Sequence, residues 1–131
     1  MKALIFLSFF LTLCFGGPVQ SNAQNSQTAR VQINTQKRLT KSRLTIRFVE
    51  LVEDSRCPTD TNCIWAGNAK IKIRLTKFGK PAKTVELNTN PGNTAVFGGY
   101  KFKLKALTPQ PATNIRINRN GYVATISVCR A

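Results

Sequence analysis

Apolar residues recur at every second position in several separate stretches of the chain after residue 43. The clearest stretch is residues 69–76, where Ala, Ile, Ile and Leu alternate with Lys, Lys, Arg and Thr. Further stretches of the same kind occupy residues 44–49, 100–106 and 122–129. Alternation places the apolar side chains of a segment on one face of an extended strand. No segment has the 3.6-residue period of a helix over three turns, so we expect an all-β protein.

Glycine, proline and asparagine separate these alternating stretches. Gly79 and Pro81 predict a turn, and residues 88–93 form a loop on composition alone. The pair Asn120–Gly121 predicts a tight hairpin between a strand at 115–117 and a strand at 122–129. Seven or eight short strands in residues 44–131 predict a small antiparallel β-sandwich or barrel. The strand count is also compatible with an immunoglobulin-like topology, although the Cys-Trp-Cys spacing of immunoglobulin domains is absent.

The first 23 residues have the layout of a secretory signal peptide. Lys2 precedes an almost continuous apolar stretch over residues 3–15, which Gly and Pro interrupt at 16–18. Ser21 and Ala23 place small residues at the −3 and −1 positions of a cleavage site. The apolar stretch is shorter than the roughly 20 residues needed to span a bilayer. We therefore expect an exported protein, periplasmic or secreted, with no transmembrane span after cleavage.

Residues 24–43 are polar and aperiodic, and we expect them to be a flexible leader before a single β-domain at 44–131. At most one short strand is expected there, at residues 30–34. Anchoring as a lipoprotein through Cys14 is disfavoured, because Leu13 precedes it where a small residue is normally found.

The composition is strongly basic, with 20 Lys and Arg against 5 Asp and Glu and a formal net charge of +15. Six cations occupy the polar faces of two expected strands: Lys70, Lys72 and Arg74, and Lys101, Lys103 and Lys105. If the two strands are neighbours, these cations share one sheet face and bind a polyanion such as an anionic envelope polymer. The alternative is a solvated face that discourages edge-to-edge pairing. Specific nucleic-acid recognition is not expected, because Tyr100 and Phe102 point to the other face.

The chain contains no histidine. A Ser-His-Asp triad, a Cys-His nucleophile pair and a histidine-ligated metal are therefore excluded. Four acidic residues cluster within eleven positions, and they are Glu50, Glu53, Asp54 and Asp60. They are candidates for acid–base catalysis or calcium binding, but we favour local ion pairs with Arg47 and Arg56. We expect neither an enzyme nor a cofactor.

Cys57 and Cys63 are separated by five residues rich in turn formers. In an oxidising compartment such a pair is expected to form a disulfide. A metal site that also uses Cys129 lacks the fourth ligand of structural zinc. We expect Cys129 to be a buried free thiol, with pairing to another chain as the alternative.

The closed loop at residues 56–65 is the sharpest candidate binding feature, and its candidate binding residues are Arg56, Pro58, Asp60 and Trp65. A pre-ordered loop loses less entropy on binding, as in a secreted protease or hydrolase inhibitor. We favour the structural interpretation, in which the loop is a stapled connection between the strand at 44 and the strand at 69, with Trp65 covering one end of the core.

The segment 54–69 contains the motif DSRCP, four residues, Cys63, one residue, then WAGNA. It resembles a motif of an uncharacterised family of small exported bacterial proteins and lipoproteins. The resemblance implies a β-domain of the bacterial envelope or a secreted one, and it implies no activity or catalytic residue. Our leading hypothesis is an exported, non-enzymatic β-domain with a binding or structural role and an unidentified partner.

Overall fold

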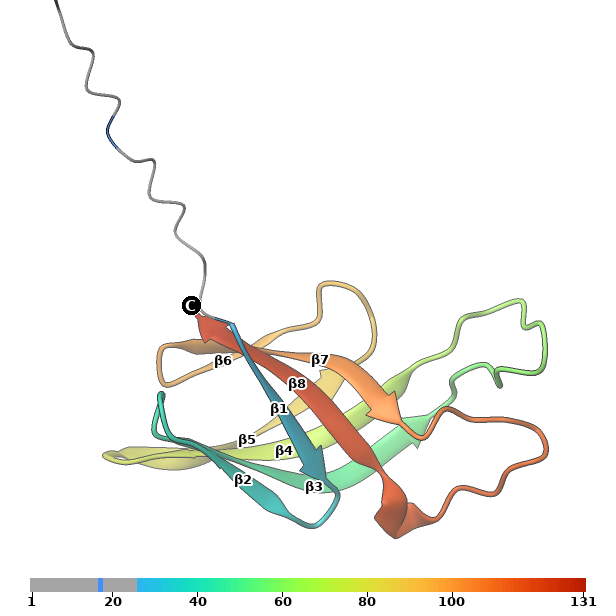
Figure 1. Cartoon of the computed structure of the whole chain (residues 1–131), viewed down its shortest axis with the longest axis horizontal. Helices are drawn as coiled ribbons and strands as arrows, with labels where there is room; N and C mark the ends of the chain where they lie inside the picture. The colour runs from blue at the N-terminus through green and yellow to red at the C-terminus, as the bar shows by residue number, and fades with distance from the viewer. Residues whose placement is uncertain (1–16, 18–25) are drawn as a thin grey trace, which may run out of the picture.

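The protein is a β-sandwich of two four-stranded antiparallel sheets (Figure 1). The computed structural model describes Gly17 and residues 26–131. Sheet A has the order β1 (Gln27–Gln32), β8 (Val123–Arg130), β7 (Tyr100–Thr108) and β6 (Ala95–Phe97). Sheet B has the order β2 (Gln36–Leu39), β3 (Leu44–Asp54), β4 (Ala69–Lys77) and β5 (Lys80–Asn88). A short 3-10 turn, η1 (Arg119–Gly121), precedes β8. The prediction of an all-β sandwich is confirmed.

The strand order follows the chain almost without interruption. Strands β2 to β5 form one meander, β6 to β8 form another, and β1 pairs with β8. The chain changes sheet only between β1 and β2 and between β5 and β6. This is the order of an up-and-down barrel that is opened into two sheets. It excludes the immunoglobulin-like topology, which requires Greek-key connections.

The core lies between the inward faces of the two sheets. In β4 the alternation has the expected effect, because Ala69, Ile71, Ile73 and Leu75 are all fully buried. The largest buried side chains opposite them belong to sheet A and include Phe102. Complete burial of one such large side chain contributes roughly 1.5–3 kcal/mol to stability. These inward faces therefore supply the main stabilisation of the fold.

The segment 24–43 differs from the expected flexible leader. From residue 27 it forms β1 and β2, and β1 pairs with β8 over its whole length. Only Ala29 and Val31 of β1 are buried. The expected short strand at 30–34 overlaps the last three residues of β1, whereas β2 was not predicted. β1 is held by its ladder with β8. The signal-peptide and Cys14 predictions lie outside the described residues, except for Gly17.

The connection between β7 and β8 also differs from the prediction. Asn120 and Gly121 belong to the 3-10 turn, and no strand forms at 115–117. The side chain of Asn118 caps this turn by accepting a hydrogen bond from the backbone N–H of Asn120 at 3.0 Å. Residues 109–122 therefore form a long loop instead of a tight hairpin. In β7, a bulge after Leu104 buries Leu107 in place of the expected Ala106.

Candidate functional site

Residues 55–68 join β3 to β4 and project from one end of the sandwich, next to the long β7–β8 loop (Figure 1). We call residues 55–68 the stapled loop. Its two arms continue the β3–β4 ladder, with Ser55 N donating to Asn68 O at 2.8 Å and Cys57 N donating to Ala66 O at 3.3 Å. The loop is thus an extension of a hairpin that starts in the core.

A disulfide joins Cys57 to Cys63, whose Cα atoms are 5.9 Å apart, so this prediction is confirmed. Among the described cysteines, Cys129 on β8 is the one that forms no disulfide. It is half-buried on the outward face opposite Lys101, and not in the core as expected.

We expect that replacing Cys57 and Cys63 together by serine lowers the free energy of unfolding by about 2 kcal/mol, because the open loop gains entropy in the unfolded chain. Urea denaturation under non-reducing conditions measures this difference. Cys129→Ser is the matched control and should change stability by less than about 0.5 kcal/mol. An equal loss in both variants would show that the effect comes from changing a thiol and not from opening the loop.

Arg56 and Asp54 form a largely buried ion pair at the base of the stapled loop, with side chains 10% and 12% exposed. Arg56 Nε lies 2.7 Å from Asp54 Oδ1, and Nη2 lies 2.9 Å from Oδ2. The guanidinium also donates to the carbonyls of Leu107 and Pro109 at the end of β7. The predicted local pairing is confirmed for Asp54. Arg56 faces inward, so it ties the loop to sheet A and is not displayed as a binding residue.

Tyr122 completes this cluster by donating its hydroxyl to Asp54 Oδ2 at 3.2 Å. Burial opposes ionisation of Asp54, but the hydrogen bonds and charge of Arg56 outweigh it and hold the pKa of Asp54 below its usual value. The same contacts act on Tyr122, whose pKa is raised by burial and by the neighbouring Asp54 charge. The cluster is therefore most stable with Asp54 ionised and Tyr122 neutral.

We expect the free energy of unfolding to decrease as the pH falls through about 4 and below. A carboxyl group whose pKa is lower in the folded state stabilises the fold above its unfolded pKa, and this contribution is lost as the folded group takes up a proton. Chemical denaturation between pH 7 and pH 2 measures the decrease. Asp54→Asn should be less stable at pH 7 and should show a flatter acid profile. An unchanged acid profile in this variant would contradict the assignment.

The stapled loop is also tied to the neighbouring β7–β8 loop. Thr59 N donates to Pro111 O at 2.9 Å, and Thr113 N donates to Asp60 Oδ1 at 3.0 Å. The Thr113 hydroxyl donates to the other Asp60 oxygen, and these bonds lower the pKa of Asp60. Pro58 is half-buried, and its carbonyl accepts from Thr61 within the loop. Asp60 and Pro58 therefore hold the shape of the loop.

Two large apolar side chains are displayed by this fixed loop. Trp65 is 81% exposed and Ile64 is 93% exposed. The structure thus does not support the interpretation in which Trp65 covers the core. Ile64 was not among the predicted binding residues, although its position beside Trp65 in an otherwise polar loop was a usable signal. Ile115, on the neighbouring loop, is 56% exposed. We call Ile64 and Trp65 the apolar tip.

The remaining acidic residues do not assemble with the apolar tip. Glu50 pairs with Lys72 across β3 and β4 at 3.6 Å, and not with Arg47 as predicted. Glu53 lies opposite Lys70 in the same ladder. Within residues 26–131, no group of three or more Cys, Asp or Glu side chains has an arrangement suited to a metal ion.

The six predicted polyanion-binding cations lie on two different sheets. Lys70, Lys72 and Arg74 are on β4 of sheet B, and Lys101, Lys103 and Lys105 are on β7 of sheet A. They therefore do not share one face, and the condition for the predicted polyanion site is not met. Both strands are internal to their sheets, so these cations do not protect sheet edges either.

Comparison with known proteins gives no family model, no curated protein and no solved structure that matches the chain. In the part of the chain that the structure describes, no helix has the length and apolar character needed to cross a membrane.

Proposed function

We propose that the protein is an exported, non-enzymatic binding protein that contacts a protein partner through the apolar tip of the stapled loop. The observation that carries the proposal is the 81% exposure of Trp65 beside Ile64, on a loop closed by a disulfide. Tryptophan is enriched among the residues that dominate binding energy at protein interfaces. A loop already held in one conformation loses little entropy on binding.

The chemistry of the loop region supports a binding role over catalysis. The two acidic residues nearest the apolar tip are occupied, Asp54 by Arg56 and Tyr122 and Asp60 by Thr113. Because the chain has no histidine, the usual general base is missing as well. The Cys57–Cys63 disulfide and the N-terminal sequence support export.

Inhibition of a protease or another hydrolase is the more specific form of this proposal. The hairpin arms of the stapled loop support it, because backbone bonds up to Cys57–Ala66 hold the tip away from the sandwich. Such a tip has the size and apolar character to enter a concave substrate site. Assays of hydrolase activity in the envelope fraction, with and without the purified chain, test this form.

The binding proposal is tested by capturing partners from the envelope fraction of the source organism with the immobilised chain. We expect Ile64→Ser/Trp65→Ser to weaken the specific complex by at least about 30-fold, the effect of losing an interface hot spot. Val96→Ser is the matched control, because Val96 is an apolar residue that is 52% exposed on the edge strand β6 of sheet A and lies outside the stapled loop. Equal capture by the wild type and the loop variant would overturn the proposal.

A further inference from the structure

Charge is unevenly distributed over the molecule. All five acidic residues lie in the half of the molecule that carries the stapled loop. Those furthest from the loop are Glu50 and Glu86, which flank Lys72 in one cross-strand row of sheet B. No carboxylate lies in the Arg74 row of sheet B or beyond it toward the β4–β5 turn. We call the end formed by the β2–β3 and β4–β5 turns the basic end. Figure 1 shows the β4–β5 hairpin at the left, opposite the stapled loop.

Cations of sheet B face one another at the basic end. Arg47 on β3 lies directly opposite Arg74 on β4. Arg38 on β2 lies opposite Thr45, two residues closer to the β2–β3 turn on the same outward face. Like charges placed opposite each other across a sheet are unfavourable. In the described chain no carboxylate lies within ion-pair distance of these arginines. An external anion would relieve their repulsion.

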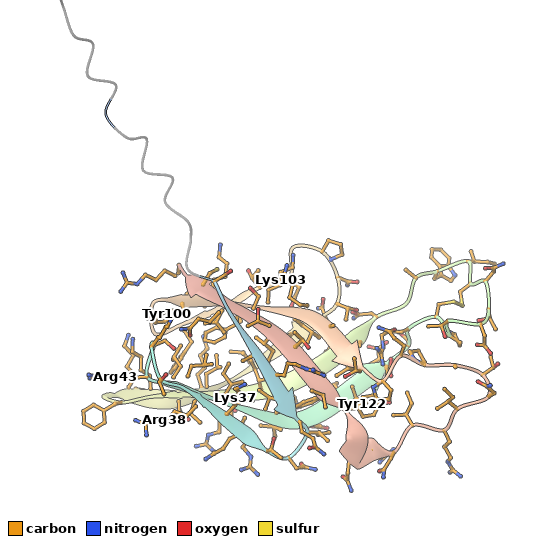
Figure 2. All side chains as sticks on the ribbon, in the orientation of Figure 1. Lys37, Arg38, Arg43, Tyr100, Lys103 and Tyr122 are labelled. Atoms are coloured by element: carbon orange, nitrogen blue, oxygen red, sulfur yellow. A yellow bond between two sulfur atoms is a disulfide. The ribbon has the colours of Figure 1, made fainter. Side chains whose placement is uncertain are left out.

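A surface hollow of about 370 Å³ lies at the basic end, lined by Arg38, Arg43, Thr45, Thr76, Lys77 and Phe78. Figure 2 shows Arg38 and Arg43 together at this end. Guanidinium groups bind phosphate oxygens in a bidentate manner, and threonine hydroxyls add further donors. Lys77 is already engaged, since its Nζ donates to Gly98 O at 2.9 Å and lies 5.2 Å from the Tyr100 ring centroid.

Phe78 lies at the tip of the β4–β5 hairpin and is 94% exposed. It stands between Lys77 and Lys80 in the turn, so an isolated aromatic ring is surrounded by positive charge. Bases of a nucleic acid would require a row of aromatic side chains for stacking. A single apolar residue on a cationic tip instead suits the boundary between anionic head groups and acyl chains.

We propose that the basic end docks on an anionic phospholipid surface, with Arg38 and Arg43 binding lipid phosphates and Phe78 entering the head-group boundary. This orientation directs the stapled loop away from the membrane, where the apolar tip remains free. The inference stands on different residues from the proposed partner binding and does not depend on it.

The test is co-sedimentation with vesicles of phosphatidylcholine containing phosphatidylglycerol, and with pure phosphatidylcholine vesicles as a reference. The chain from Gln24 onward is used, because it contains every described strand and lacks the apolar residues 3–15. Binding is expected only with the anionic vesicles. Arg38→Gln/Arg43→Gln should weaken it about 25-fold, since each cation near such a surface contributes about fivefold. Phe78→Ser should weaken it about tenfold.

Lys101→Gln/Lys105→Gln removes the same charge from exposed positions of sheet A and is the matched control, expected to weaken binding less than about threefold. If Arg43→Gln lowers the melting temperature, Arg38→Gln/Lys80→Gln makes the same test. Trp65 is the only tryptophan, and its emission should stay unchanged on vesicle binding. The proposal would be overturned by a blue shift of the Trp65 emission, or by a loss of vesicle binding in the Lys101/Lys105 variant equal to that in the Arg38/Arg43 variant. It would also be overturned if a single-stranded oligonucleotide, added at the same total negative charge as the vesicles, displaced the protein from them.

Discussion

Arg56→Gln should lower the free energy of unfolding by about 3–5 kcal/mol, the range for removing one partner of a buried ion pair. The substitution leaves the Asp54 carboxylate largely buried without its cation, and it removes the donors to the Leu107 and Pro109 carbonyls. Arg56→Lys should recover little of the free energy of unfolding that Arg56→Gln loses, because one ammonium group does not reproduce the bidentate contact with Asp54 and both carbonyl contacts. Urea denaturation at pH 7 measures these differences.

Arg47→Gln is the control for this experiment. Arg47 is an exposed arginine of β3, the strand that ends in Asp54, and it forms no ion pair among the described residues. Its replacement should change the free energy of unfolding by less than about 0.5 kcal/mol. If Arg56→Gln has an effect as small as this, Arg56 does not hold the base of the stapled loop, and the inward placement of its side chain is contradicted.

Gly67→Ala should destabilise the protein by about 2–5 kcal/mol. Gly67 has φ +69, and a Cβ atom added there would lie 1.8 Å from Ser55 O and 2.6 Å from Ser55 C. Part of the loss, about 1–2 kcal/mol, comes from placing an L side chain in the left-handed region. The rest comes from separating the two arms of the stapled loop, where Ser55 N bonds to Asn68 O.

Gly79→Ala separates the two contributions. Gly79 has φ +79, but nothing lies within 4 Å of its added Cβ atom. This variant should therefore lose only the conformational contribution of about 1–2 kcal/mol. Thermal or urea unfolding of both variants gives the difference. Equal losses at the two positions would contradict the close approach of Gly67 to the backbone of Ser55.

Local sequence patterns were sufficient where one segment contained the whole signal. The alternation in residues 69–76 identified β4 and its buried face, and the spacing of Cys57 and Cys63 identified the disulfide. The signal failed where a partner distant in sequence determines the structure. Only residues 30–32 of β1 were expected to form a strand, because its pairing with β8 fixes the rest, and the Asn120–Gly121 pair lies in a 3-10 turn that Asn118 caps.

In the candidate site, too, local features could be predicted from the sequence, whereas contacts with residues distant in sequence could not. The sequence predicted a disulfide-closed loop at residues 56–65, but it favoured a core-covering role for Trp65, which the structure shows exposed, and it included Arg56 and Asp60 among the candidate binding residues. Their partners, Leu107 and Thr113, lie more than fifty positions away, so only the fold reveals that these side chains hold the loop. The basic end was not predicted either, because its arginines and lysines belong to separate strands and turns and are brought together by the register of β2, β3 and β4.

The proposed contact between the apolar tip and a partner protein is tested most directly by site-specific photo-crosslinking in cells of the source organism. A benzophenone amino acid replaces Trp65 in one variant and Phe78 in another; Phe78 belongs to the β4–β5 turn, which lies at the opposite end of the molecule from the stapled loop (Figure 1). We expect a discrete crosslinked protein product from position 65 and none from position 78. A protein product from position 78 together with none from position 65 would contradict binding through the stapled loop.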